Sequence, residues 1–91
     1  MIEMQFYLAT DWCASSRKMH HVFSDLYKDL TSEGIKMTEI DVESEWGVDM
    51  SCKYGVRNVP TILVVKDGKV LDRIKGKRTK SEIKDIVEKW K

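Results

Sequence analysis

The chain has 91 residues, of which 42% are hydrophobic and 34% charged, and its formal net charge is +1. These values are typical of a globular chain with one core, so we expect a single domain over residues 1–91 and no long disordered segment. The near-zero net charge predicts no nucleic-acid partner, and no apolar stretch approaches the ~20 residues that a membrane span needs.

Residues 2–9 form an apolar run that predicts a buried first strand. This run carries no basic leader and no small-residue cleavage site, which argues against a signal peptide. Apolar residues at helical spacing then predict a helix over about 14–31, namely Met19, Val22, Phe23, Leu26, Tyr27 and Leu30. The stretch "IKMTEIDV", residues 35–42, is rich in apolar and β-branched side chains and predicts a second strand.

The next segment, residues 44–56, combines two glycines with a short stripe at helical spacing, formed by Val48, Ser51 and Tyr54. This mixture predicts a short or irregular helix. Residues 60–66, "PTILVVK", predict a third strand that begins at the only proline of the chain. An Asp-Gly turn at 67–68 then predicts a hairpin to a returning strand over residues 69–76.

The closing helix has a start signal of its own. Thr79 and Glu82 have the spacing of a capping box, in which each side chain accepts a hydrogen bond from the other residue's backbone. The resulting order is β-α-β-α-β-β-α. This order predicts an α/β fold with a four-stranded mixed sheet and helices on both faces.

Cys13 stands at the junction of the first predicted strand and the first predicted helix. Unpaired backbone N–H groups and the positive dipole end of a helix stabilise a thiolate at such a position. Arg17 adds positive potential, and Ser15 and Ser16 offer hydroxyl groups that can hydrogen-bond the sulfur. The pattern predicts a reactive cysteine, whereas the alternative is a half-buried cysteine that only packs beside Trp12.

Two stretches resemble the thioredoxin family, "DWCASSRK" at 11–18 and "YGVRNVPTILVVKDGKV" at 54–70, and an amphipathic C-terminal helix follows them. The resemblance covers nearly the whole chain and implies the thioredoxin fold. It also implies that Pro60 is a cis-proline facing the sulfur and that the backbone of Val59 hydrogen-bonds an extended substrate. The remaining substrate-binding positions that it implies are Trp12, which would shield one side of the thiol, Ala14, Ser15 and Gly76.

The chain departs from the family pattern at the resolving cysteine, which here is Ser16. A serine cannot expel the reduced product, so we expect this Cys-Ala-Ser-Ser site to stop at a mixed disulfide until an external thiol arrives. Such a site is either a natural monothiol form or an engineered Cys-to-Ser variant. Tyr7 also replaces the family's buried Asp, Ala14-Ser15 replaces its Gly-Pro, and His21 falls near its helix-kinking proline.

Cys52 and the two histidines are the other candidates for chemistry. We expect Cys52 on the exposed side of its helix, away from Pro60, without a disulfide to Cys13. His20 and His21 point about 100° apart in a helix and do not form a metal-binding pair, so we expect no metal and no cofactor.

The residues and the resemblance together predict a thiol–disulfide oxidoreductase that reduces disulfide-containing proteins through Cys13. A thioredoxin reductase or another dithiol reductant would recycle the dithiol parent form. One alternative is a monothiol glutaredoxin-like protein that uses glutathione or holds an iron–sulfur cluster, although no Gly-Gly-x-Asp turn follows the third strand. The other is a redox-silent module that binds a partner through the surface of Trp12, Val59 and Gly76. We expect a cytoplasmic monomer, because two cysteines without a disulfide framework favour a reducing compartment.

Overall fold

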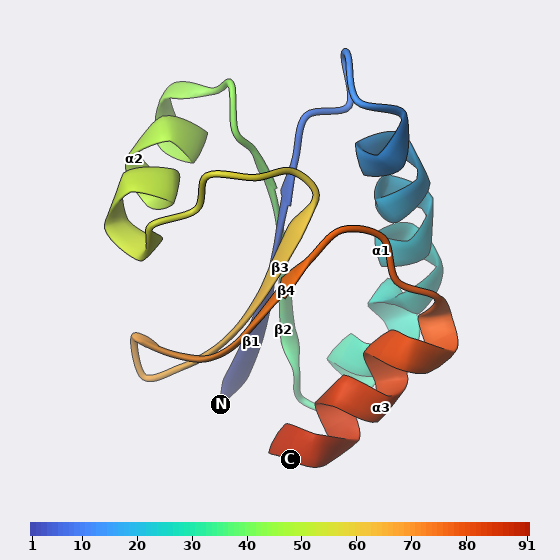
Figure 1. Cartoon of the computed structure of the whole chain (residues 1–91). Helices are drawn as coiled ribbons and strands as arrows, with labels where there is room; N and C mark the ends of the chain where they lie inside the picture. The colour runs from blue at the N-terminus through green and yellow to red at the C-terminus, as the bar shows by residue number, and fades with distance from the viewer.

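Four strands and three helices follow one another in the predicted order in the computed structural model, which describes all residues 1–91 (Figure 1). The strands are β1 (Ile2–Leu8), β2 (Lys36–Asp41), β3 (Thr61–Lys66) and β4 (Lys69–Lys75). The helices are α1 (Ala14–Ser32), α2 (Glu45–Tyr54) and α3 (Lys80–Trp90). None of the helices combines the length and apolar character that a membrane crossing requires.

The strands form one mixed sheet in the order β2-β1-β3-β4. The β1–β2 pair is parallel, whereas β1–β3 and β3–β4 are antiparallel. The parallel pair is joined by the crossover helix α1, and the β3–β4 pair is joined by the tight turn that the Asp-Gly pair predicts. The predicted α/β fold with a four-stranded mixed sheet is therefore confirmed.

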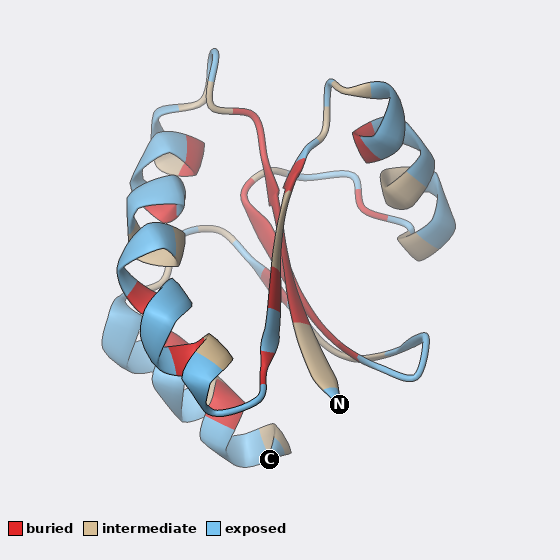
Figure 2. Cartoon of the chain, turned by 180° about the vertical axis from the view of Figure 1, so that it is seen from behind, coloured by how far each residue is buried: buried red, intermediate tan, exposed pale blue.

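The sheet separates two hydrophobic clusters, because successive side chains of a strand point to opposite faces. Helices α1 and α3 cover one face, and α2 covers the other (Figure 1). Met4, Phe6 and Leu8 of β1 belong to the larger cluster, together with residues of α1 and α3. Tyr7 belongs to the smaller cluster, whose other buried members are Ile40, Val56, Leu63 and Val65. Figure 2 shows that the buried positions concentrate in the strands and on the inward sides of the helices.

Helix α2 is regular and has a clear start and end. The backbone N–H of Gly47 donates to Ser44 Oγ at 2.9 Å, and Gly55 adopts the left-handed conformation that ends the helix. The predicted apolar stripe was wrong at Val48, which is 51% exposed. The buried residue of α2 is Gly47. It packs so closely against Asp41 that an ideal Cβ at this position would lie 1.7 Å from the Asp41 carbonyl oxygen.

We expect Gly47→Ala to lower the free energy of unfolding by about 1–3 kcal/mol, although alanine is the better helix former. The added methyl group would overlap the Asp41 carbonyl group, so the helix must move away from β2. Asp49→Ala, on the exposed side of the same helix, is the matched control and should leave stability nearly unchanged. Urea denaturation of both variants measures the difference, and equal stabilities would contradict the close packing at Gly47.

The capping box at the start of α3 is confirmed. The backbone N–H of Glu82 donates to Thr79 Oγ1 at 3.1 Å, and the backbone N–H of Thr79 donates to Glu82 Oε1 at 3.0 Å. The two bonds satisfy N–H groups that have no partner inside the helix. The backbone N–H of Thr79, and after it the Thr79 hydroxyl group, lower the pKa of the Glu82 carboxyl group, because hydrogen bonds to the carboxylate favour its charged form.

Candidate active site

Cys13 is the N-cap residue of α1, and its backbone is extended, with φ −107° and ψ 110°. Its N–H donates to the carbonyl oxygen of Ala9 at 2.9 Å, and its own carbonyl oxygen accepts from the N–H of Arg17 at 3.1 Å. The first bond ties the helix start to the end of β1. The side chain of Cys13 is partly exposed, so the sulfur lies at a helix N-terminus that solvent and a substrate can reach.

Hydrogen bonding lowers the pKa of the Cys13 thiol below its ordinary value. The largest cause is the Ser16 hydroxyl group, followed by the backbone N–H of Ser16. The backbone N–H of Ser15 and the positive charge of Arg17 act in the same direction, while partial burial opposes them. More of the sulfur is therefore thiolate at neutral pH than in an ordinary cysteine, and the thiolate is the reactive form.

Ser16 is completely buried, with 0% of its surface exposed. Its Oγ accepts a hydrogen bond from the backbone N–H of Ala9 at 3.0 Å. A hydroxyl group has one donor besides its acceptor positions, so the Ser16 proton remains available to the Cys13 sulfur. Ser16 thus joins the end of β1 to the first turn of α1 and also polarises the thiol.

We expect Ser16→Ala to raise the pKa of Cys13 toward the value of a free cysteine, about 8.5. The reason is the loss of the hydroxyl donor that contributes most to the lowered pKa. Ser15→Ala is the matched control, because Ser15 acts through its backbone N–H and should change the pKa little. The pH dependence of alkylation, measured in a Cys52→Ser background, reports Cys13 alone. An unchanged pKa in Ser16→Ala would contradict the role of the hydroxyl group.

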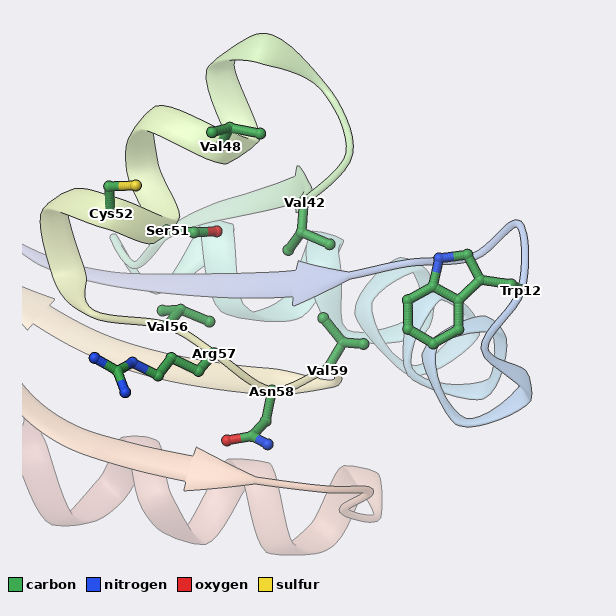
Figure 3. A pocket seen from close by; sticks show the side chains of 9 residues that line it. All are labelled: Trp12, Val42, Val48, Ser51, Cys52, Val56, Arg57, Asn58 and Val59. Atoms are coloured by element: carbon green, nitrogen blue, oxygen red, sulfur yellow. The ribbon is translucent and has the colours of Figure 1, made fainter.

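Trp12 is 63% exposed, and its indole Nε1 donates to Glu43 Oε1 at 2.8 Å. The indole lies beside Val59 at one end of a groove of about 300 Å³ (Figure 3). The other apolar walls of the groove come from the turn after β2, from α2 and from the segment before β3, at Val42, Val48 and Val56. The groove thus begins next to Cys13 in sequence and runs beneath α2.

The predicted docking residues after α2 come from two separate parts of the chain. The Val59–Pro60 peptide bond is cis, and Pro60 is buried while Val59 lines the groove. The N–H of Gly76, directly after β4, donates to the carbonyl oxygen of Pro60 at 2.9 Å. Gly76 has φ +87°, a conformation that favours glycine. Ala14 and Ser15 are the remaining predicted substrate-binding positions; Ala14 is exposed and Ser15 is partly buried.

Cys52 is exposed, and both cysteines are free. The predicted exposure of Cys52 and the predicted absence of a disulfide to Cys13 are confirmed, and the structure adds a contact of Cys52 with the groove. Cys52 lines the same groove as Trp12 and Val59, at the end formed by α2 (Figure 3). The sequence could not show this, because the position of α2 depends on the contact of Gly47 with β2.

Tyr7 is fully buried on the α2 face of the sheet, and its hydroxyl group donates to Gln5 Oε1 at 2.7 Å. Burial raises the pKa of the Tyr7 phenol to about 12, and the charges of Tyr54 and Glu3 act in the same direction. The phenol is therefore neutral at physiological pH. It cannot serve as the proton acceptor that the family's Asp implies.

The adjacent histidines lie on the exposed side of α1, and only His20 has a partner. Its Nδ1 lies 2.7 Å from Glu39 Oε2 on β2. The rings of His20 and His21 are tilted at a centroid distance of 5.7 Å. No group of three or more His, Cys, Asp or Glu side chains has the arrangement of a metal site.

A sheet of order β2-β1-β3-β4 with a partly exposed cysteine at the start of the first crossover helix defines the class of thioredoxin-fold redox proteins. The thioredoxin family model matches residues 3–89, and the chain belongs to the thioredoxin family. This is a family of thiol–disulfide oxidoreductases.

Curated relatives agree with this assignment, and a solved structure agrees with the fold. The chain is 31% identical over 78 residues to thioredoxin of Bacillus subtilis, covering 86% of this chain and 72% of that protein. It is 29% identical over 79 residues to thioredoxin of Listeria monocytogenes, covering 87% and 74%. The X-ray structure of Fasciola hepatica thioredoxin superposes with a TM-score of 0.84 and 23% identity, covering 99% of this chain and 81% of that one. The family resemblance inferred from the sequence is confirmed.

Proposed function

We propose that the chain is a monothiol protein-disulfide oxidoreductase in which Cys13 is the nucleophile. The observation that carries this proposal is a partly exposed thiol at the N-terminus of α1 whose pKa is lowered by hydrogen bonds from Ser16 and Ser15. An inert packing cysteine has no need of such an environment. The lowered pKa therefore favours thiol chemistry over a redox-silent binding module.

The reaction begins when the Cys13 thiolate attacks one sulfur of a substrate disulfide. A bond forms between Cys13 Sγ and that sulfur, the substrate S–S bond breaks, and the second substrate sulfur leaves as a thiolate that takes a proton from water. The Ser16 hydroxyl group cannot attack this mixed disulfide at neutral pH. An external thiolate then attacks the mixed disulfide and releases either the substrate or Cys13 as a thiolate.

The substrate segment would dock beside the sulfur on surfaces from three parts of the chain. Trp12 and Val59 supply apolar groove walls, and Pro60 and Gly76 form the neighbouring backbone. The exposed Ala14 and partly buried Ser15 would contact the substrate at the start of α1. Disulfide-containing proteins are the proposed substrates, and a reducing, cytoplasmic compartment remains the prediction for its location.

The proposal is tested by mixing the reduced chain with a protein disulfide such as insulin and following covalent adducts by mass spectrometry. We expect a one-to-one adduct on Cys13 that persists until excess small dithiol is added. Cys52→Ser should still form the adduct, whereas Cys13→Ser should not. Adducts that require Cys52, or none at all, would overturn the proposal. Rapid turnover with glutathione as the only reductant would instead favour the glutaredoxin-like alternative.

A further inference from the structure

A second pocket, of about 250 Å³, lies against the segment between α2 and β3, which also forms one wall of the groove. The two cavities share Val56, Arg57 and Asn58. Whereas the groove is mainly apolar, the second pocket is lined by three cationic side chains and no carboxylate: Arg57, Arg73 and Lys75. We call this cavity the cationic pocket.

The positive charge of the cationic pocket is not neutralised by neighbouring carboxylates. None of its three cations forms an ion pair with an acidic side chain. The Asp72 carboxylate, next to Arg73 in sequence, accepts from the backbone N–H of Arg73 and from Trp90 Nε1 of α3, the helix on the opposite face of the sheet, and not from the Arg73 guanidinium. Since Arg57, Arg73 and Lys75 are all exposed, the pocket presents its charge to solvent.

The guanidinium group of Arg73 is held in a fixed position within the pocket. Its guanidinium donates to the carbonyl oxygens of Tyr54 at 2.7 Å and Gly55 at 3.2 Å, at the end of α2. A guanidinium held by two hydrogen bonds loses less freedom on binding an anion than a free side chain does. The cation therefore stands at a defined place between α2 and β4.

The cationic pocket shares lining residues with the proposed docking region. Lys75 directly precedes Gly76, whose N–H is bonded to the carbonyl oxygen of Pro60. Arg57 and Asn58 precede Val59 and line both cavities. A segment that reaches Cys13 along the groove would thus have its neighbouring side chains close to the cations.

We propose that the cationic pocket is a specificity subsite that receives an acidic side chain of a disulfide-bearing protein substrate. The inference rests on the proposed function and adds a preference among substrates. A carboxylate is the complementary group, because it can accept from Arg57, Arg73 and Lys75, and no acidic residue of the chain lines the pocket. Substrates with Asp or Glu near the reacting cysteine are the expected partners.

The kinetic test compares two disulfide-bearing peptides that differ only in two residues next to the reacting cysteine, Glu-Glu or Gln-Gln. We expect the chain to form its mixed disulfide about 3–10-fold faster with the Glu peptide at low salt, with the preference falling as salt screens the charges. The double variant Arg57→Gln and Lys75→Gln should reduce this ratio to about one. Lys69→Gln removes the same kind of charge at the far end of β4 and should keep the preference.

A binding test separates this inference from the thiol chemistry. Cys13→Ser is titrated with disulfide-free Glu and Gln peptides, and backbone amide NMR shifts are followed at Arg57, Asn58 and Lys75. Shifts that are larger with the Glu peptide support the subsite. Adducts that form equally fast with both peptides overturn the subsite and leave the proposed function standing. If neither peptide forms an adduct, the proposed function fails, and equal NMR titrations then overturn the subsite as well.

Discussion

Ser16→Cys is expected to raise the steady-state rate of protein-disulfide reduction by about 100-fold or more when external thiol is scarce, because a well-placed intramolecular thiol acts at a very high effective concentration. In this variant the introduced sulfur attacks the mixed disulfide, forms an internal disulfide with Cys13 and releases the reduced product. The backbone position is favourable, since Ser16 lies in the first turn of α1 and its hydroxyl group is the largest cause of the lowered pKa of the Cys13 thiol. Turnover of insulin disulfides with a limiting dithiol measures the gain.

The matched control for this experiment is Ser15→Cys. It adds the same thiol one residue away from the resolving position, and Ser15 influences Cys13 through its backbone N–H alone. We expect it to leave the chain stalled at the mixed disulfide. A rate that does not increase in Ser16→Cys would mean that a resolving thiol is not what limits this chain. An equal gain in Ser15→Cys would show that position 16 has no special geometry.

Tyr7→Asp, which restores the acidic residue of the family, is expected to destabilise this chain by about 3–5 kcal/mol. The phenol ring fills the cluster beneath α2 with Ile40, Val56 and Leu63, so the shorter side chain leaves a cavity. The new carboxyl group would also be buried beside Glu3, whose negative charge already acts on the Tyr7 position. Urea denaturation measures the loss of stability. A change below about 1 kcal/mol would contradict this prediction.

The pH dependence of Tyr7→Asp gives a second readout. Burial raises the pKa of a carboxyl group in the folded state above its unfolded value, so its folded form binds protons more tightly. The variant should therefore lose stability as the pH rises from about 4, the unfolded pKa, through the folded pKa. Tyr7→Phe, which keeps the ring and removes the hydrogen bond to Gln5, should lose only about 1 kcal/mol and show no such pH dependence.

The fold was largely predictable from the sequence, because local signals specify most of its elements. The apolar spacing of α1, the Asp-Gly turn between β3 and β4, and the Thr79–Glu82 box each act over a few residues. The orientation of α2 was not predictable in this way. The exposure of Val48 and the burial of Gly47 depend on how closely the helix approaches the Asp41 carbonyl group, which no local pattern encodes.

The sequence predicted the reactive thiol of Cys13, but it did not predict the groove and the pocket that lie near this thiol. The junction of strand and helix predicts a thiol at a helix N-terminus, and the structure adds the buried Ser16 and its bond to the Ala9 N–H. The shared groove of Trp12 and Cys52 joins residues far apart in the chain and required the tertiary structure. The cationic pocket likewise required the tertiary structure. Strand alternation predicts that Arg73 and Lys75 share one face of β4, but it does not predict that Arg57, in the segment after α2, lies beside them.

The segment between α2 and β3 is anchored at both of its ends, and this affects how the groove recognises a partner. Arg73 holds the Tyr54 and Gly55 carbonyl groups, the N–H of Val56 donates to the carbonyl oxygen of Ser51, and Thr61 Oγ1 donates to that of Asn58 at 2.6 Å. A wall restrained in this way is preorganised for binding. The conformational entropy lost in forming a complex then comes mainly from the incoming polypeptide, so flexible segments of a partner should bind more weakly than segments already held extended.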